Sequence, residues 1–191
     1  WQHPPMRIRP ARPDDAPALA ALFAANRHDA LTERQRAEQG FVQGSFDEAA
    51  LRAMAGAGNV LVAEEAGALA GLVCLAAPGD VPDPPPPVAA LLAAQDRLEW
   101  QGRPLSATRW LLYGPVVVGA GYRGKGVARG LYEAALRSAA PRAEAVVAFV
   151  ERANEASRKV HVDGFGMAVL GGYEVHGRAY EVVAAAARPS A

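Results

Sequence analysis

The chain has 191 residues, which is enough for one domain with a sizeable core and too few for two full domains. Twenty Lys plus Arg balance twenty Asp plus Glu, which excludes a global field that would draw the protein to nucleic acid or to an anionic membrane. No apolar run approaches the roughly 18 residues that a membrane helix needs, so we expect a soluble protein that binds neither nucleic acid nor membrane.

The N-terminal stretch WQHPPMRIRPARP lacks a basic region followed by an apolar stretch and a cleavage site of small residues. It does not read as a signal peptide, and a cytoplasmic location is expected. Residues 1–5 precede Met6 and are expected to have no role in the fold, being disordered or left over from expression. Cys74, the lone cysteine, excludes an intramolecular disulfide and a cysteine-rich metal site, and its apolar neighbours predict a buried thiol.

The first half of the chain predicts short strands and two helices. MRIRP (6–10) predicts a strand, and the spacing of apolar residues predicts a helix over 14–26. Residues 45–48 have the S-x-x-E form of a capping box, with Ser45 as the N-cap of a second helix. The runs NVLVAEE (59–65) and LAGLVCLA (69–76) predict an antiparallel hairpin.

The middle of the chain contains a proline-rich break. PGDVPDPPPPV cannot continue a helix or a strand ladder, and 88–100 predicts a short helix within an insertion, 78–106, that we expect to shape a site. WLLYGPVVVG (110–119) predicts a strand that Gly114-Pro115 interrupts, which implies an unpaired N–H, a bulge or a divergence from the neighbouring strand.

The last third predicts a βα unit and a closing hairpin. Residues 127–140 predict an amphipathic helix, and the apolar run 144–151 predicts a buried strand that lies parallel to 110–118. NEASRKVHV (154–162) predicts a short helix with Asn154 as its cap, and two β-rich stretches surround His176-Gly177 as a hairpin.

Three nucleotide-binding templates overlap in VVVGAGYRGKGVARGLY (116–132): G-x-G-x-x-G, G-x-x-x-x-G-K and R-x-x-G-x-A. The Walker A template fails because Gly126 stands where a Ser or Thr hydroxyl should bind Mg²⁺. The dinucleotide template needs an acid about 20 residues beyond its glycines, whereas Glu151 stands 27 residues past Gly124. An NAD-type oxidoreductase therefore remains only as a weaker alternative.

The third template fits a strand-to-helix turn whose main-chain N–H groups face a pyrophosphate at the positive end of a helix. Arg123, Lys125 and Arg129 add cationic side chains without needing a metal. The opposing interpretation is a glycine-rich turn without a ligand, which the interleaved basic residues disfavour.

At this point the sequence resembles the GCN5-related N-acetyltransferase family. The resemblance rests on YRGKGVARGLYEAAL, on the order of elements, and on NEASRKVHVDGF, which is similar to the family's N-x-x-[AS]-x-x-x-[YH] helix followed by GF. It covers residues 6–186 as a single acyl-CoA N-acyltransferase domain. The resemblance implies an α/β (α+β) fold with a mixed, twisted sheet of about seven strands, helices on both faces, and a V-shaped splay between two parallel central strands.

The resemblance also implies a cofactor site and no metal. Acetyl-CoA (coenzyme A) would lie in the V as co-substrate, with its pantetheine arm paired like a strand. The implied cofactor-binding residues are Val116, Val117, Val118, Arg123, Gly124, Lys125, Gly126, Val127, Ala128, Arg129, Asn154 and Ser157. For Asn154 and Ser157, helix capping and surface exposure is an equally good interpretation.

The catalytic residues are less well defined. His161 stands where many relatives carry a tyrosine that acts as the general acid, and it would protonate the departing thiolate. The alternative is a histidine at the end of a helix that compensates the helix dipole. Relatives often carry an acid on the splayed strand, but 112–115 has none. Tyr113 could act as the base through a water, or Glu64, Glu99 or Glu151 could reach the site.

The resemblance implies an acetyl-CoA-dependent N-acetyltransferase that acts on an amine by direct transfer in a ternary complex, as a monomer or homodimer. The amine acceptor would meet the thioester through 26–44, 78–106 and 171–177, with aromatics such as Phe41, Trp100 and Tyr173. The non-enzyme alternative is an acyl-CoA-binding or sensing module.

Overall fold

The structure is a computed structural model that describes residues 5–27, 46–81 and 83–188. Residues 1–4 of the predicted N-terminal extension, and the predicted 26–44 connection from residue 28 onward with its Phe41, lie outside the described residues. The described chain divides into two compact units. The first consists of residues 5–27, 46–75 and 114–135, and the second of residues 76–81, 83–113 and 136–188. The single domain predicted for 6–186 stays a prediction.

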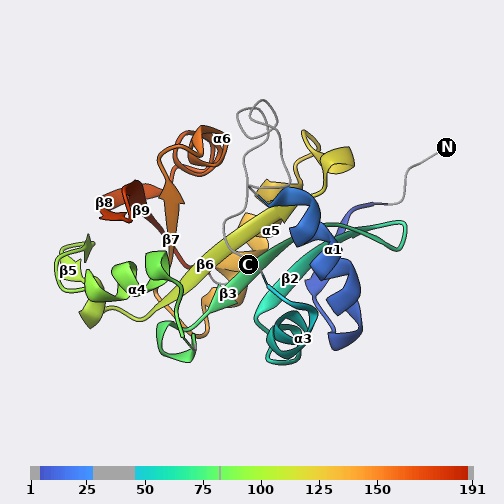
Figure 1. The fold of residues 1–191 in the computed structure, drawn as a ribbon, viewed down its shortest axis with the longest axis horizontal. Coiled ribbons are helices and arrows are strands. Elements are labelled where there is room, and N and C mark those ends of the chain that lie inside the picture. The colour runs from blue at the N-terminus through green and yellow to red at the C-terminus, as the bar shows by residue number, and fades with distance from the viewer. Residues whose placement is uncertain (1–4, 28–45, 82, 189–191) are drawn as a thin grey trace. The chain divides into compact units, whose positions relative to one another are not determined.

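Within the described residues, one seven-stranded sheet has the strand order β1-β2-β3-β6-β7-β9-β8 (Figure 1). Its strands are β1 (Arg7–Pro10), β2 (Val60–Glu65), β3 (Ala68–Ala76), β6 (Trp110–Val118), β7 (Ala145–Glu151), β8 (Ala168–Val175) and β9 (Arg178–Ala186). Strands β6 and β7 are parallel, whereas the β1–β2, β2–β3, β7–β9 and β8–β9 pairs are antiparallel. The predicted mixed α/β architecture, both hairpins and the parallel pair are confirmed.

The first unit combines β1, β2, β3 and the second half of β6 with helices α1 (Ala16–Asn26), α3 (Glu48–Gly56) and the first part of α5 (Val127–Ala139). Short 3-10 helices precede α1 and α5: η1 (Pro13–Asp15) and η5 (Ala120–Tyr122). Helices α1 and α3 pack on each other and on the strands of this unit through Leu19, Phe23, Leu51, Val62 and Leu72. Their apolar residues recur at helical spacing, so each helix buries one side.

The start of α3 differs from the predicted capping box. The helix begins at Glu48 with Asp47, not Ser45, as its N-cap. The Asp47 carboxylate accepts a hydrogen bond from the Ala50 backbone N–H at 2.7 Å, and a charged cap of this kind satisfies a first-turn amide and favours the positive end of the helix. The sequence pattern therefore found the helix but placed its cap two residues too early.

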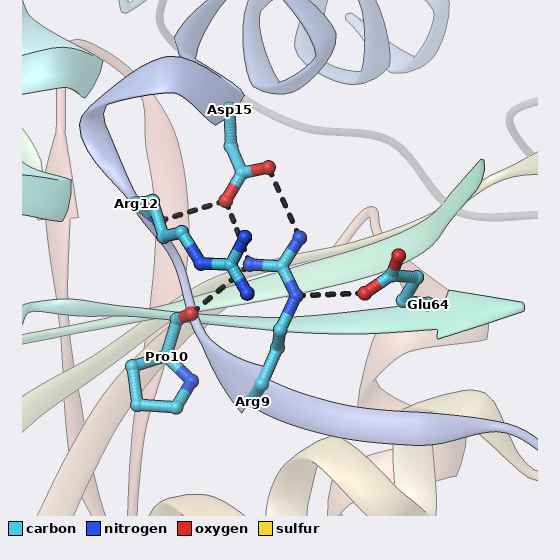
Figure 2. Close-up of polar contacts among 5 residues, drawn as sticks. All are labelled: Arg9, Pro10, Arg12, Asp15 and Glu64. Atoms are coloured by element: carbon cyan, nitrogen blue, oxygen red, sulfur yellow. Dashed lines mark hydrogen bonds and ion pairs between the residues drawn. The ribbon is translucent and has the colours of Figure 1, made fainter. Parts of the chain in front are cut away.

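Arg9 links β1 to η1 and to β2 (Figure 2). Its Nε donates to Glu64 Oε2 at 2.7 Å, and its Nη1 and Nη2 donate to the two carboxylate oxygens of Asp15 at 2.8 and 3.1 Å. Arg9 is buried, with 9% of its surface exposed, so these charge-assisted hydrogen bonds replace its lost hydration. The hydrogen bonds from Arg9 are the main reason why the pKa of Asp15 lies below its ordinary value.

The second unit combines the first part of β6 with β7, β9 and β8, and its core is formed by residues such as Leu91, Leu98, Leu105, Val147 and Val182. The rest of its regular structure consists of the last turn of α5, η3 (Pro78–Asp80), α4 (Pro86–Ala93), β4 (Glu99–Trp100), β5 (Arg103–Pro104), η4 (Leu105–Ala107), α6 (Glu155–Arg158) and the π-helix η6 (Lys159–Gly164). The predicted helix 154–162 is thus an α-helical turn that continues as a π-helix.

The insertion contains a shorter helix than the sequence predicts. Helix α4 begins inside the proline run, because prolines at the first helical positions lack only N–H groups that the helix does not use. It ends at Ala93 rather than at 100, and turns over 94–98 bury Leu98 in the core. The insertion is fastened to β8, since the Tyr173 hydroxyl donates to the Pro87 carbonyl at 2.7 Å and Arg97 donates to the Gly172 carbonyl at 2.9 Å.

Candidate functional site

Two glycines immediately before α5 have left-handed backbone conformations. Gly124 has φ +75° and Gly126 has φ +79°, a region that other residues adopt only with strain. A Cβ atom built on either glycine would meet nothing within 4 Å, so the space above both is open. The turn R-G-K-G therefore presents bare backbone to an open space, as a cradle for a close-fitting ligand requires.

Helix α5 starts directly at this turn. The Gly126 carbonyl accepts the first helical hydrogen bond from the Gly130 N–H at 3.0 Å. The amides of Val127 and Ala128 then have no partner inside the helix, and they lie at its positive end. The Val127 side chain is buried, which fixes where the helix begins. Glycine turn and helix start together form an anion-binding geometry.

The basic side chains of this turn have different surroundings. Arg123 Nη2 donates to Asn26 Oδ1 at 2.6 Å, and burial lowers the pKa of Arg123. Asn26 is itself buried at the end of α1, where its Nδ2 donates to the Leu22 carbonyl at 2.8 Å. Lys125 Nζ lies 5.7 Å from the centre of the Tyr122 ring, and Arg129 is exposed on the first turn of α5. Asn26 thus orients Arg123, a role that the sequence did not indicate.

The valines proposed to face a pantetheine arm lie on β6. Val117 is buried, whereas Val116 and Val118 are partly exposed, and the following Gly119 N–H donates to the Ala70 carbonyl of β3 at 2.8 Å. The strand also contains the predicted Gly114-Pro115 irregularity: the peptide bond between them is cis, and Gly114 has φ +110°.

The parallel ladder between β6 and β7 is short. In the part of the chain that the structure describes, it joins Trp110, Leu111 and Leu112 to Ala145, Val146 and Val147. Strand β7 continues to Glu151, and it pairs with β9 along its whole length. The ladder therefore ends before Gly114, where the sequence predicted a defect in pairing.

Tyr113 and His161, proposed separately as catalytic residues, contact each other in the second unit. The Tyr113 hydroxyl lies 3.2 Å from His161 Nε2, and the two rings meet edge to face at 5.6 Å. Both residues are buried, with 4% and 7% of their surfaces exposed, and Phe165 packs edge-on against the imidazole at 5.3 Å. The sequence named both residues but not their contact.

The surroundings of His161 assign its protons. Nδ1 lies 2.9 Å from the Ser157 carbonyl oxygen, which can only accept, so Nδ1 carries the ring proton. Nε2 is then the acceptor for the Tyr113 O–H. Burial lowers the pKa of His161, and the hydrogen bond to Ser157 opposes this only in part, so the imidazole is neutral at pH 7.

Asn154 and Ser157 form the start of the helix that carries His161. The buried Asn154 side chain accepts a hydrogen bond from the Ser157 backbone N–H at 3.3 Å, which is the predicted cap. The Ser157 hydroxyl lies 3.4 Å from His161 Nδ1. One role of both residues is therefore to orient the imidazole.

The three carboxylates considered as bases differ in their surroundings. Glu64 is bound by Arg9, and Glu99 is exposed on β4. Glu151 ends β7 with only 10% of its side chain exposed, and its Oε2 lies 3.7 Å from Arg178 Nη1. Over the described ranges, no group of three or more His, Cys, Asp or Glu side chains is arranged to hold a metal ion.

The sequence model of the acetyltransferase (GNAT) family matches residues 24–167, which is more than half of the chain and includes the glycine turn, Tyr113 and His161. The chain belongs to the acetyltransferase (GNAT) family. No curated protein sequence matches it significantly.

Solved structures of acetyltransferases have the same fold. An acetyltransferase of this family from Streptococcus agalactiae is 15% identical with a TM-score of 0.66, and the match covers 97% of each chain. The protein YncA of Salmonella typhimurium, solved with its cofactor acetyl-CoA, is 20% identical with a TM-score of 0.63, over 97% of this chain and 96% of its own. An N-acetyltransferase from Staphylococcus aureus is 20% identical with a TM-score of 0.60, over 96% and 99%.

The GNAT fold of this chain has no helix, within the ranges described, with the length and apolar character that crossing a bilayer requires. The predicted family and fold are thus confirmed. The assignment of individual residues to cofactor binding and catalysis remains a prediction, which the geometry of the glycine turn and of the Tyr113–His161 pair makes specific enough to test.

Proposed function

We propose that this GNAT protein is an acetyl-CoA-dependent N-acetyltransferase that acetylates a primary amine of a small molecule or peptide by direct transfer in a ternary complex. Two findings support acetyl-CoA as the acetyl donor: membership of an acetyltransferase family, and the likeness to a protein solved with acetyl-CoA. The observation that carries the proposal is the open glycine turn at Gly124 and Gly126, which meets the start of α5.

The turn suits a pyrophosphate. The amides of Val127 and Ala128 would donate to phosphate oxygens, and Lys125 would add charge from the exposed side of the turn. Val116 to Val118 would offer main-chain groups to an extended arm. When bound, acetyl-CoA supplies the thioester from which the acetyl group is transferred.

The Tyr113–His161 pair suits the transfer of the amine proton. The neutral imidazole can accept the Tyr113 hydroxyl proton at Nε2. At the same time, the Tyr113 oxygen can accept a proton from the amine. The protonated imidazole could later return a proton through Tyr113 to the leaving thiolate. Ser157 holds Nδ1 throughout, so the ring does not turn away. The pair thus offers a base on a strand segment that has no carboxylate.

Gly126→Leu tests the assignment, because its side chain would fill the open space above the turn. Acetyl-CoA binding, measured by calorimetry, should weaken by more than about 100-fold, since the pyrophosphate loses close backbone contacts. Gly58→Leu is the matched control: Gly58 has φ +77° and a similarly open Cβ position, but it follows α3. Unchanged affinity in Gly126→Leu, or an equal loss in Gly58→Leu, would contradict the cradle.

Turnover needs its own measurement. Release of free thiol from acetyl-CoA should increase with members of a primary-amine panel and give an acetylated amine by mass spectrometry. Binding of NADH in place of coenzyme A would favour the oxidoreductase alternative. Tight binding of acetyl-CoA without any amine-dependent release would instead identify a sensing module.

A further inference from the structure

A row of three side chains crosses strands β8, β9 and β7 in the second unit. Tyr173 is paired with Tyr180, and Tyr180 is paired with Glu151, in two antiparallel registers. Directly opposed residues of an antiparallel sheet project from the same face, so the three side chains are neighbours. The two tyrosine rings stack at 5.6 Å with an angle of 28° between them.

Glu151, at one end of this row, is a buried carboxylate with an unsatisfied oxygen. Only 10% of its side chain is exposed, and within the described residues Oε2 accepts no hydrogen bond. Arg178 Nη1 lies 3.7 Å away, beyond hydrogen-bond distance, on a side chain that is half exposed. A buried carboxylate oxygen without a donor is costly, and the described part of the chain supplies no hydrogen-bond donor to this one.

A cavity of 310 Å³ opens beside the row. Tyr173, Tyr180, Gly172 and Ala179 form part of its wall, together with Arg152 and Glu174. Glu151 is the cross-strand partner of Tyr180, and after burial its charge is the next cause of the raised pKa of the Tyr180 phenol. The cavity thus has two aromatic side chains in its wall, and Glu151, which is not itself a lining residue, is the cross-strand neighbour of one of them and lacks a donor to Oε2 within the described ranges.

The rigidity of the wall favours a built site. The Tyr173 hydroxyl is fixed on the Pro87 carbonyl, and the Tyr180 ring meets Phe149 edge to face at 5.8 Å. Because the Tyr173 hydroxyl donates to Pro87 and one face of its ring stacks on Tyr180, the other face of the ring is the part that a ligand in the cavity can contact. Aromatic faces attract cations, and more strongly so when the cation leaves water.

The neighbouring arginines do not turn the cavity into an anion site. Arg152 lies 3.7 Å from Glu181 Oε1, and Arg158 Nε lies 2.8 Å from Oε2 of the same buried glutamate. Arg178 can move into solvent because half of its side chain is exposed. An anion would also leave Glu151 Oε2 without a donor, whereas an ammonium group supplies up to three.

We propose that Glu151 and the Tyr173–Tyr180 pair bind the ammonium group of the acceptor, a small primary alkyl- or arylalkylamine. This inference rests on the proposed N-acetyltransferase function, for which it names the class of acceptor. Glu151 binds the cation and can accept the one proton that an ammonium group must lose before its nitrogen attacks a thioester, and Tyr173 and Tyr180 contact its carbon body. The insertion positions Tyr173 through Pro87 and so takes part in acceptor selection.

Binding without turnover tests this site. Benzylamine, benzyl alcohol and benzoate are titrated separately, with and without coenzyme A, while the amide NMR signals of Gly172 and Ala179 report on the cavity wall. We expect benzylamine to shift both signals and the neutral and anionic analogues to shift neither. Glu151→Gln should weaken benzylamine binding about tenfold or more, because it removes a charge-assisted hydrogen bond.

Arg178→Gln should change the affinity for benzylamine in the opposite direction to Glu151→Gln. If Glu151 served only as a partner of Arg178, both variants would lose stability and neither would change amine binding. With an ammonium site, Arg178→Gln removes a competing cation and tightens benzylamine binding several-fold. Glu155→Gln, on the exposed side of α6, is the control and should leave the dissociation constant unchanged.

Four results would overturn the proposal: no shift by any of the three compounds at millimolar concentration, equal shifts by benzyl alcohol, stronger binding of benzoate, or unchanged benzylamine binding in Glu151→Gln. None of these measurements requires acetyl transfer. A failure of the ammonium site therefore leaves the N-acetyltransferase proposal to its own thiol-release test, and the reverse also holds.

Discussion

The hydroxyl of Tyr113 lies 3.2 Å from Nε2 of His161, and the other ring nitrogen of that histidine is held by the Ser157 carbonyl. A buried imidazole therefore has a fixed tautomer, with its basic nitrogen directed at a tyrosine. This arrangement can accept a proton without any carboxylate.

Tyr113→Phe removes the hydroxyl and keeps the ring. If the pair transfers the amine proton, kcat should fall by about 100-fold, the lower end of what general acid–base catalysis contributes, with the acetyl-CoA KM unchanged. His161→Phe should lower kcat to a similar extent, and the double variant should lose little more, because the two residues act as a unit. Wild-type kcat in Tyr113→Phe, or fully additive losses, would show that the contact is structural.

The protonation of His161 gives a pH dependence whose sign can be worked out. Because burial lowers its folded-state pKa below the ordinary 6.5, the unfolded chain binds this proton first as the pH falls. The contribution to stability is fully present above about pH 6.5 and is lost as the pH falls through the folded-state pKa. NMR titration of the imidazole should therefore give a midpoint below 6.5, and His161→Gln should remove that signal. A midpoint above 6.5 would contradict the neutral assignment.

Asn26 orients Arg123 through a hydrogen bond of 2.6 Å. Asn26→Ala should raise the dissociation constant of acetyl-CoA about tenfold, the effect of one hydrogen bond to a charged group, because the turn that follows Arg123 loses an anchor. Asn59→Ala, a control in the same unit, should leave it unchanged. If calorimetry gave the same acetyl-CoA affinity for the wild type and Asn26→Ala, the role of Asn26 would be limited to the end of α1.

The Arg9 cluster predicts where acid weakens the first unit. The folded-state pKa of Asp15 is lowered by Arg9, so its contribution to stability is present above the ordinary value of 3.8 and is lost as the pH falls through the lower folded-state value. Asp15→Asn should destabilise the protein by about 2 kcal/mol at pH 7. By thermal unfolding, this difference should shrink at pH 3, whereas the exposed neighbour Asp14→Asn should have little effect at either pH. A difference that is the same at both pH values would refute the assignment.

Local patterns in the sequence predicted most of the fold. The glycine turn before α5 could be recognised because its glycines and the helix that follows are adjacent in the chain. The parallel strand after α5 was predicted from a continuous apolar run. The insertion was less predictable: helix 88–100 follows apolar spacing, but the turn after Ala93 depends on Leu98 reaching a core whose other residues come from distant strands.

The contacts of the candidate site could not be predicted in the same way. Asn26 and Arg123 are separated by 97 positions, and Tyr113 and His161 by 48. No periodicity connects residues so far apart, so the sequence named Tyr113 and His161 separately and missed Asn26. The unsatisfied oxygen of Glu151 is likewise a property of the folded chain, since only burial makes its lack of a donor costly.

Each compact unit is built from several stretches of the chain, and the stretches of the two units alternate along the sequence. Strand β6 and helix α5 each pass from one unit into the other. On a ribosome, the first unit cannot be completed until residue 135 has emerged, by which time residues 76–113 of the second have already been made. A single cut therefore cannot release either unit as a fragment free of residues from the other, and cleavage between residues 76 and 113 would leave both units with missing strands or helices.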